Sequence, residues 1–472
     1  MRNFFLAFLI LAGLSGAVIS YALEAIGIAP RRLAPYVEQR AAGHNPTIVA
    51  IGNWIGQALL TADRGTNVVS GLPRLTIGAQ PEAALSDTAA PLRRVPVTSL
   101  AAAIAAFSEA IPGDQITFAP GRYRFSGLHV SIDRPGANNH PITVRSAKPG
   151  TVVLEFDMTE GFHVSASYWT FENLTITGVC GDHSNCEHAF HVTGDATHFI
   201  ARNNTITNFN AHFKINGVER RMPDHGLIEG NTLSNTTVRH TNNPVTIIDL
   251  VAASGWMIRK NFLSDFIKQD GNQISYGAFA KGAGSNNVFD NNIVVCEYRL
   301  QGMPGQRVGL SFGGGGTGAQ YCRDRRCIVE QEGSAMRGNL IASCSDEGIY
   351  LNRSATSRLI HNTLIDTGGI SVRFPESSAD IEGNLVDGLI RARDGAIIRD
   401  RDNRDTSTTR LLLGSHPVRQ LFGAAGAKSF DGVAPQRTVT TEADTVADLC
   451  GGTADGSHAY GAFTNFAGCV RK

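Results

Sequence analysis

The sequence has no net charge, few aromatic residues and no phosphate-binding motif. Lys and Arg together number 42, and Asp and Glu also number 42, so the formal net charge is zero. A neutral chain exerts no long-range attraction on nucleic acid, and we therefore expect no nucleic-acid partner. The glycine run Gly313–Gly316 is not followed by Lys-Ser or Lys-Thr, as a phosphate loop would require. Aromatic residues make up only 7% of the chain whereas glycine contributes 51 residues, a composition typical of a turn-rich β protein.

The chain also lacks a zinc-binding pattern, although it contains eight cysteines. Their spacings do not match a zinc ribbon, and the histidines do not complete a metal pattern. Three pairs are close in sequence: Cys180 with Cys186, Cys322 with Cys327, and Cys450 with Cys469. We expect three or four disulfides and an oxidising compartment; free structural thiols are the alternative.

The N-terminus carries a long apolar run. Arg2 precedes Phe4–Ala22, which contains no charged residue and is long enough to cross a bilayer. Residues 1–25 are therefore either a cleaved signal peptide or a retained membrane anchor. Either one predicts a periplasmic, secreted or membrane-anchored extracytoplasmic protein. Residues 26–96 are predicted to be a helical spacer and linker, with no chemistry assigned to them.

The signal for a regular fold begins at residue 97. An amphipathic helix is predicted there, with Leu100, Ile104, Phe107 and Ile111 on one stripe and Pro112-Gly113 as its end. Strand-length alternating segments follow. A repeated unit then recurs, in which an apolar residue, two mostly polar residues and Asn precede alternating apolar residues. Its asparagines are Asn173, Asn204, Asn231, Asn261, Asn292, Asn339, Asn362 and Asn384.

The asparagines are 22 to 31 residues apart, with one longer gap before Asn339. A period in this range, with strand-length runs in each unit, predicts an all-β solenoid of three short strands per coil. Stacked asparagines can bond to one another and to buried turn backbone. The segment from the helix through Asp114-Gln-Ile-Thr-Phe to Gly121-Arg-Tyr resembles the opening of the pectate-lyase-like right-handed parallel β-helix superfamily. The resemblance implies a single-stranded right-handed parallel β-helix over residues 97–400, with residues 401–472 closing it.

The strand before each asparagine turn alternates between inward apolar and outward polar residues. The predicted outward residues are His163, His191, Lys214, Asp249, Lys281, Ser311, Tyr350, Asn352 and Arg373. We expect Lys214, Asp249 and Lys281 on consecutive coils, with Arg373 three coils beyond Lys281, roughly 14 Å away. The alternative is an ordinary exposed face, which is polar because it meets water.

A row of Lys, Arg, His and Tyr suits a uronic-acid polysaccharide. Removal of the proton next to a carboxylate requires a cation on the carboxylate, a base on the carbon and an acid on the leaving oxygen. A lysine beside other cations can have a lowered pKa and act as the base. We predict Lys281, Asp249 and Tyr350 as catalytic residues. The predicted substrate-binding residues are His163, His191, Lys214, Phe279, Asn352 and Arg373.

Residues 278–293, AFAKGAGSNNVFDNNI, resemble a coil of the chondroitinase-B/alginate-lyase family of polysaccharide lyases. Lys281 matches the catalytic lysine of that family. The family's acidic calcium ligands stand five and seven residues before the lysine, where this chain has Tyr276 and Ile274. Its Arg-His-Gly in the next coil corresponds to Ser311-Phe312-Gly313. The resemblance therefore implies a lyase without calcium or another cofactor, in which Lys214, His191 or Arg373 binds the carboxylate.

Two other functions remain open from the sequence. Pro223-Asp224-His225-Gly226 resembles the Asp-Pro-His motif of mannuronan epimerases, and a uronate C5-epimerase begins with the same proton abstraction. A non-catalytic β-helix that binds polysaccharide or supports an envelope assembly is the other alternative. Glycoside hydrolysis has less support, because Asp249 is the only acid in the row, although Asp346 and Glu347 lie in a loop. We expect a monomer that binds an acidic polysaccharide, and a membrane contact if the N-terminal segment is retained.

Overall fold

Parallel strand pairing dominates the structure. The computed structural model describes residues 27–65, 72–81, 90–314, 316–422, 430, 432–438, 446–451 and 459–471. The predicted signal or anchor at residues 1–25 lies outside this part of the chain. Among the described residues, no helix has both the length and the apolar character needed to cross a membrane.

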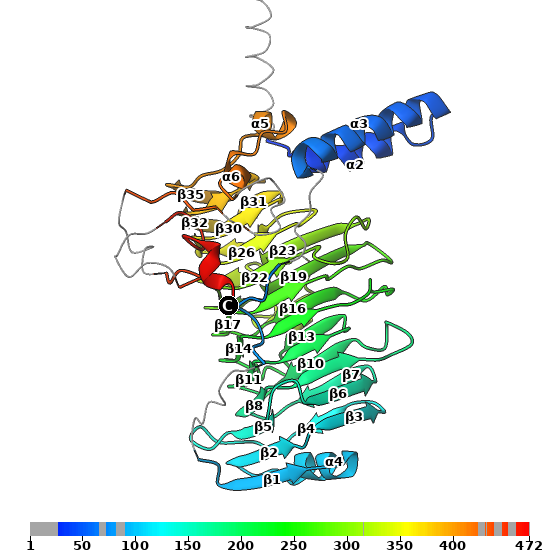
Figure 1. The fold of residues 1–472 in the computed structure, drawn as a ribbon. Coiled ribbons are helices and arrows are strands. Elements are labelled where there is room, and N and C mark those ends of the chain that lie inside the picture. The colour runs from blue at the N-terminus through cyan, green and yellow to red at the C-terminus, as the bar shows by residue number, and fades with distance from the viewer. Residues whose placement is uncertain are drawn as a thin grey trace, which may run out of the picture.

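Successive coils contribute their strands to three long parallel sheets (Figure 1). The first sheet contains β1 (Arg93–Val97), β2 (Asp114–Phe118), β5 (Ile142–Ser146), β8 (Trp169–Glu172), β11 (Ile200–Arg202), β14 (Leu227–Glu229), β17 (Met257–Arg259), β21 (Val288–Asp290), β25 (Ala335–Arg337), β29 (Ser357–Ile360), β32 (Ser378–Glu382) and β35 (Ile397–Arg401). The second sheet contains β4 (Val130–Ile132), β7 (Glu160–Val164), β10 (His188–Thr193), β13 (Ala211–Asn216), β16 (Val245–Val251), β19 (Ile274–Lys281), β23 (Gln306–Phe312), β27 (Ile349–Asn352), β31 (Gly369–Arg373) and β34 (Leu389–Arg393).

The third sheet contains β3 (Gly121–Ser126), β6 (Val152–Asp157), β9 (Thr175–Gly178), β12 (Thr205–Thr207), β15 (Thr232–Ser234), β18 (Phe262–Ser264), β22 (Ile293–Val295), β26 (Leu340–Ala342), β30 (Thr363–Ile365) and β33 (Leu385–Val386). A short fourth sheet contains β20 (Gly284–Ser285), β24 (Gln331–Glu332) and β28 (Ser354–Ala355). The predicted right-handed parallel β-helix is confirmed. Its first sheet already begins at β1, inside the stretch that we predicted to be a spacer.

The asparagine ladder forms at the turn between the first and third sheets. The side-chain amide of Asn231 donates to Asn261 Oδ1 at 3.0 Å, and that of Asn261 donates to Asn292 Oδ1 at 3.0 Å. The same bond links Asn204, Asn231, Asn261, Asn292, Asn339, Asn362, Asn384 and Asn403 in sequence. Each amide satisfies turn backbone that would otherwise be buried without a partner.

The structure corrects the ladder in two places. Asn173 is not a member, because the N–H of Leu174 is the group that donates to Asn204 Oδ1. Asn403 extends the ladder by one coil beyond the prediction. The left-handed backbone also belongs to the residue before each ladder asparagine, such as Lys260 with φ 54°. The asparagines are therefore needed for their amides and not for their tolerance of positive φ.

The core is filled by the inward side chains that the alternation predicted. Phe162, Phe190 and Phe213 are buried on adjacent strands of the second sheet. Their rings stack with centroids 5.2 Å apart in each step. Such stacking adds to the free energy gained by removing the rings from water.

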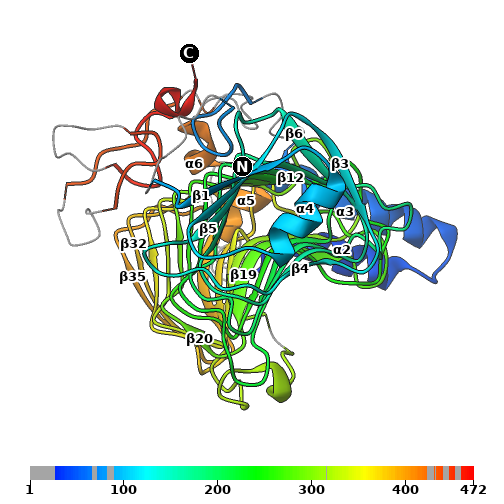
Figure 2. The same ribbon diagram turned by 90° about the horizontal axis from the view of Figure 1, so that it is seen from below.

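The cap helix α4 (Leu100–Ser108) covers the first coil (Figure 2), but its buried face differs from the predicted stripe. Ala103, Ala106 and Phe107 are buried, and the Phe107 ring contacts Phe162 edge-on at 5.7 Å. Three residues of the predicted stripe are exposed, namely Leu100, Ile104 and Ile111. The buried face of the helix therefore consists of small alanines and one large side chain, Phe107.

A helical hairpin of α2 (Pro30–Ala41) and α3 (Pro46–Arg64) packs beside the last coils, at the opposite end from α4 (Figure 1). The buried Arg31 guanidinium joins α2 to α3 through Asp63 at 2.5 Å. It also bonds the carbonyl of Cys344 at 2.7 Å and Asp366 at 3.1 Å. The hairpin thus lies at the last coils although it precedes β1 in sequence. Between the two, Gly78 N–H donates to Lys260 O, which holds this segment against the middle coils of the solenoid.

The C-terminal part contains α5 (Thr408–Leu412), α6 (Pro417–Gln420) and the short helix η3 (Phe466–Cys469), and another short helix, η1, spans Ala319–Tyr321. Apolar side chains of this part, including Phe463 and Phe466, pack on the outward side of the third sheet against Ile293 and Leu340. All eight cysteines form disulfides: Cys180–Cys186, Cys296–Cys344, Cys322–Cys327 and Cys450–Cys469. Four disulfides indicate an extracytoplasmic protein.

Candidate active site

The outward face of the second sheet carries the predicted row, in a register that differs by two residues at Lys281. Strand pairing aligns His163, His191, Lys214 and Asp249 directly. Opposite Asp249 on the next strand is Phe279, followed by Ser311 and Tyr350. Lys281 pairs with Val251 instead. Lys214, Asp249 and Lys281 do lie on the consecutive strands β13, β16 and β19, as predicted, but Lys281 stands in a neighbouring column.

That neighbouring column continues toward Arg373. On the strand after β19, the position next to Lys281 is taken by Gly313, whose N–H donates to Ala280 O at 2.7 Å. Further along, Asn352 pairs directly with Arg373. Arg373 is three strands beyond Lys281, as predicted from the coil count.

Asp249 and Lys214 form a close ion pair, with Asp249 Oδ2 2.7 Å from Lys214 Nζ. Asp249 is only 5% exposed. Its other oxygen, Oδ1, is buried and has no hydrogen-bond partner among the described residues. A buried carboxylate oxygen without a donor is costly, so this atom is suited to accept a hydrogen bond from a bound molecule.

Lys281 lies partly buried at the end of β19, under a loop that starts at Gly313. A Cβ on Gly314 would lie 3.3 Å from Lys281 Cδ, so a glycine at this position leaves room for the lysine. Burial and the nearby Lys214 ammonium lower the pKa of Lys281, while the carboxylates of Asp249 and Glu330 oppose this effect. A lysine with a lowered pKa is more often neutral and can accept a proton.

The loop over Lys281 is anchored to the solenoid by several contacts. The disulfide Cys322–Cys327 closes it, as predicted. Arg323 N–H donates to Gly282 O at 2.9 Å, and the Arg323 guanidinium binds Asp224 at 2.8 Å. Asp224 of the epimerase-like motif is therefore occupied as an anchor for this loop.

Phe279 is buried beneath Lys281 and is only 4% exposed. The Lys281 ammonium sits over its ring, 4.4 Å from the centroid. Tyr276 contacts the same ring edge-on, with centroids 5.4 Å apart. Phe279 thus supports the lysine and offers no free ring face to a sugar in this structure.

Tyr350 and Arg373 lie in a separate cavity of about 1140 Å³ between the second sheet and the helical hairpin. Tyr276 also lines it, and burial raises the pKa of Tyr276 to about 12, helped by Tyr350 and Asp346. Asn352 Nδ2 donates to the Tyr350 hydroxyl at 3.1 Å. The hydrogen bond from Arg373 to Asp394 raises the pKa of Arg373, as does its bond with Tyr350. The structure therefore divides the predicted residues between two adjoining regions.

The hairpin wall of this cavity is strongly charged, which the sequence did not reveal. Arg32 contacts Asp346 at 2.9 Å and is also paired with Glu347. Arg64 contacts Asp366 at 3.2 Å. No local pattern marks these arginines as site residues, because their partners lie some 300 residues further along the chain.

Glu160 is a second residue that the sequence analysis missed. It lies three residues before His163, with its Oε2 2.8 Å from His163 Nδ1 and its Oε1 2.8 Å from His191 Nδ1. Burial alone would raise the pKa of Glu160, but the hydrogen bonds from the two histidines outweigh it and hold the pKa of Glu160 well below its usual range. The sequence does offer one signal. Glu160 is an acidic residue at the first position of the strand that carries the predicted outward residue His163.

Three sheets of parallel strands and an asparagine ladder define this chain as a right-handed parallel β-helix protein, with an outward row of ionisable groups on one sheet. No protein-family model matches the sequence. The structure is similar to that of pectate lyase Pel9A, with a TM-score of 0.53 and 15% sequence identity, covering 81% of this chain and 98% of that one. An alginate lyase from Paenibacillus sp. str. FPU-7 aligns with a TM-score of 0.33 and 16% identity, covering 66% of this chain and 99% of that one.

In sequence, the chain is 30% identical over 108 residues to pectate lyase L of Dickeya chrysanthemi. The match covers 18% of this chain and 25% of that relative. The chain thus spans about a quarter of the length of the curated relative that it matches. The similarity to Pel9A shows that the two chains share the β-helix fold.

Proposed function

We propose that this protein is a polysaccharide lyase that cleaves a uronic-acid polysaccharide by β-elimination on the outward face of the second sheet. The observation that carries the proposal is the cluster of Lys281, Asp249 and Lys214 on consecutive strands, in which burial and Lys214 lower the pKa of Lys281. The names of the similar proteins, which are pectate and alginate lyases, favour a pectate-like or alginate-like substrate.

In the proposed reaction, neutral Lys281 takes the proton from the sugar carbon next to the carboxylate. The electron pair of that C–H bond forms a carbon–carbon double bond, and the bond to the glycosidic oxygen breaks. The leaving oxygen takes a proton from the Lys281 ammonium formed in the first step and becomes a hydroxyl, which returns Lys281 to its neutral form. Lys214 supplies positive charge near the substrate carboxylate, and Asp249 Oδ1 accepts a hydrogen bond from a sugar hydroxyl.

Tyr350 then has a different role from the catalytic one that the sequence analysis predicted. β27 lies two strands from β19, which is roughly 10 Å at the usual strand spacing. We assign Tyr350, Asn352 and Arg373 to binding a neighbouring sugar in the same chain. His191 would bind the polysaccharide on the other side of Lys214.

The residues around Lys281 do not fit a calcium ion. Calcium requires six to eight oxygen ligands. Asp249 is paired with Lys214, and Glu330 Oε2 accepts a hydrogen bond from Gly282 N–H at 2.9 Å. Tyr276 is turned toward the Phe279 ring. We therefore propose a reaction that does not use calcium at Lys281.

We further propose that the protein acts as a monomer outside the cytoplasm, in the periplasm, in secreted form or tethered by its N-terminal segment. The test is to incubate the protein with alginate, pectate, chondroitin, hyaluronan and glucuronan, and to follow the ultraviolet absorbance of the unsaturated product. The Lys281→Ala variant should lose at least about 10²-fold in kcat, as expected for loss of a general base. Lys260→Ala, at an exposed position near the ladder, is the matched control.

Three outcomes would oppose the proposal. Activity that is equal in Lys281→Ala and in Lys260→Ala would exclude the lysine as the base. Binding of a uronate polymer without any product would favour the non-catalytic alternative. A change in uronate configuration without chain cleavage would favour the epimerase.

A further inference from the structure

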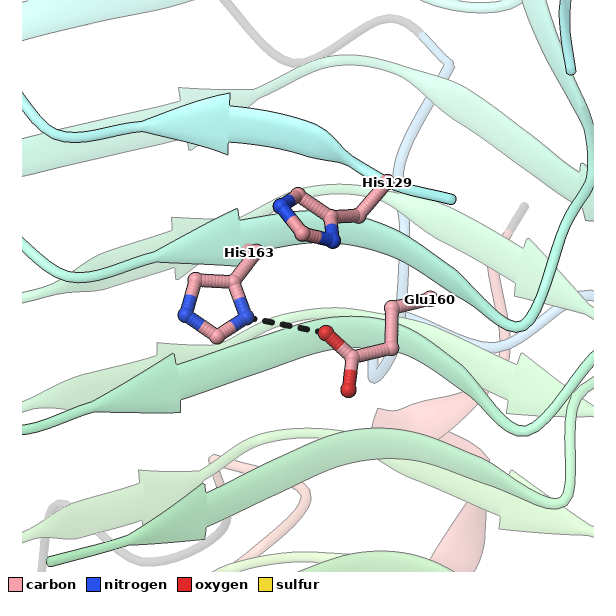
Figure 3. Close-up of side chains that lie close together, drawn as sticks. All are labelled: His129, Glu160 and His163. Carbon is pink, nitrogen blue, oxygen red and sulfur yellow. Dashed lines mark hydrogen bonds and ion pairs between the residues drawn. The ribbon is translucent and has the colours of Figure 1, made fainter. Parts of the chain in front are cut away.

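A cluster of two histidines and one glutamate lies at the first-coil end of the second sheet, apart from Lys281. His129 precedes β4, while Glu160 and His163 are on β7. One potential ligand atom from each of the three residues lies within 4.8 Å of the other two. Figure 3 shows His129 with one ring nitrogen turned toward the Glu160–His163 pair. The three groups therefore converge on one point in space.

The backbone around this cluster holds the side chains on the same face. Val130 and Phe162 pair across β4 and β7 and point into the core, which turns the flanking His129 and His163 outward. The rings of His129 and His163 are 4.9 Å apart at their centroids. Gly161 lies between Glu160 and Phe162, where a Cβ would come within 2.5 Å of the Ala189 carbonyl oxygen, so glycine is needed for β7 to approach β10 at this point.

We propose that His129, Glu160 and His163 form a binding site for a divalent transition-metal ion of the zinc type. Two imidazole nitrogens and one carboxylate oxygen suit zinc, cobalt or nickel, whereas calcium and magnesium prefer oxygen ligands alone. The ion takes the place between His163 Nδ1 and Glu160 Oε2, which are 2.8 Å apart, and His129 swings in as the third ligand. Three protein ligands leave a fourth coordination position for water or another ligand.

Neighbouring residues fix the carboxylate in the orientation that the site needs. The second oxygen of Glu160 lies 2.8 Å from His191 Nδ1, and His191 Nε2 lies 2.8 Å from Asn216 Oδ1. Outer-shell contacts of this kind orient metal ligands and increase metal affinity. The site is separate from the proposed reaction centre, because β7 and β16 are separated by β10 and β13, a distance of roughly 14 Å.

The proposal is tested by calorimetry on the full chain, purified with an affinity tag that contains no histidine and freed of metal by a chelator. Titration with Zn²⁺ should show one site of micromolar or tighter affinity, and Ca²⁺ should bind at least about tenfold more weakly. His129→Ala should weaken Zn²⁺ binding at least about tenfold. This exposed residue can be replaced without disturbing the core. His240→Ala is the control, because His240 lies in another surface pair, with His183.

Two further measurements make the result decisive. Co²⁺ should give the visible absorption of a four-coordinate site in the unaltered protein but not in His129→Ala. Glu160→Gln keeps the shape of the side chain but removes its charge, and should also weaken Zn²⁺ binding. No Zn²⁺ binding to the unaltered protein would overturn the proposal, as would equal affinity in the His129→Ala and His240→Ala variants. None of these readouts depends on lyase activity.

Discussion

The ammonium nitrogen of Lys281 lies 4.4 Å from the centre of the Phe279 ring, on the strand next to Asp249. The ring occupies the column position directly opposite Asp249, and the lysine reaches back over it from two residues further on. This arrangement brings the lysine within the electrostatic influence of both Asp249 and Lys214. The two neighbours act on the lysine with opposite signs.

Opposite shifts in the pH profile should therefore follow from removing each neighbour. The base must be neutral, so activity rises as the pH passes through the pKa of Lys281, which burial places below its ordinary value. Asp249→Asn removes a charge that raises this pKa, and should move the rise of kcat/KM to lower pH. Lys214→Met removes a charge that lowers it, and should move the rise to higher pH. Asp157→Asn, on the third sheet, should leave the profile in place, and shifts of the same sign in both site variants would contradict the assignment.

The hairpin should depend on Arg31 for its attachment to the last coils. Arg31→Ala leaves Asp63 without its buried partner and removes one of the cations paired with Asp366; breaking a buried ion pair typically costs about 3–5 kcal/mol. We expect hydrogen exchange in α2 and α3 to accelerate and proteases to cleave the hairpin. Arg40→Ala is the control, because exposed Arg40 interacts with Tyr36 on its own helix, and should change stability by less than about 0.5 kcal/mol. Unchanged exchange in Arg31→Ala would mean that other contacts hold the hairpin.

Removing one amide of the asparagine ladder should lower the free energy of unfolding far more than removing the exposed side chain of the residue before it. Asn261→Ala removes the acceptor of two Asn231 donors and the donor to Ile228 O. Each buried group left unpaired costs about 1–3 kcal/mol, so we expect at least about 2 kcal/mol in chemical denaturation. Lys260→Gly should be almost neutral, because Lys260 is exposed and has a positive φ that glycine adopts freely. Equal effects of the two substitutions would show that the ladder adds little.

Acid should destabilise the protein partly through His212. This side chain is fully buried with Nε2 3.1 Å from Ser234 O, and burial lowers its pKa to about 3. Between pH 6.5 and 3 the unfolded chain therefore binds a proton that the folded chain does not, and the free energy of unfolding falls as the pH falls. The residue contributes at most about 1.4 kcal/mol per pH unit. Denaturation of His212→Gln between pH 4 and 6 should show a flatter dependence than the unaltered protein, whereas the exposed His44→Gln should not.

The fold could be predicted because every coil repeats the same turn chemistry. Asn231, Asn261 and Asn292 bond to one another in an identical way, and that identity is visible as a period in the sequence. The exact register could not be predicted, because strands of the second sheet differ in length and the alternation is interrupted inside them, at Ile247-Ile248 of β16 as well as in β19. Gly277 and Ala278 both face the core, so Tyr276 turns outward and Phe279 takes the place opposite Asp249.

The cavity could not be predicted from the sequence, for a different reason. One wall comes from β19, β27 and β31, and the other comes from the hairpin near the start of the chain. No local pattern connects Arg32 with Glu347 or Arg64 with Asp366. Only the return of the chain along the solenoid brings them together.

The attachment of the hairpin also dictates an order of events during synthesis. Arg31 leaves the ribosome early, yet the Cys344 carbonyl and Asp366 that receive it are made 313 and 335 residues later. Coils can stack on one another as they emerge, since each contacts mainly its neighbours. The hairpin must wait for the final coils, so the cavity closes only after they have formed. A nascent or truncated chain could thus possess most of the solenoid and the lysine while still lacking the finished cavity.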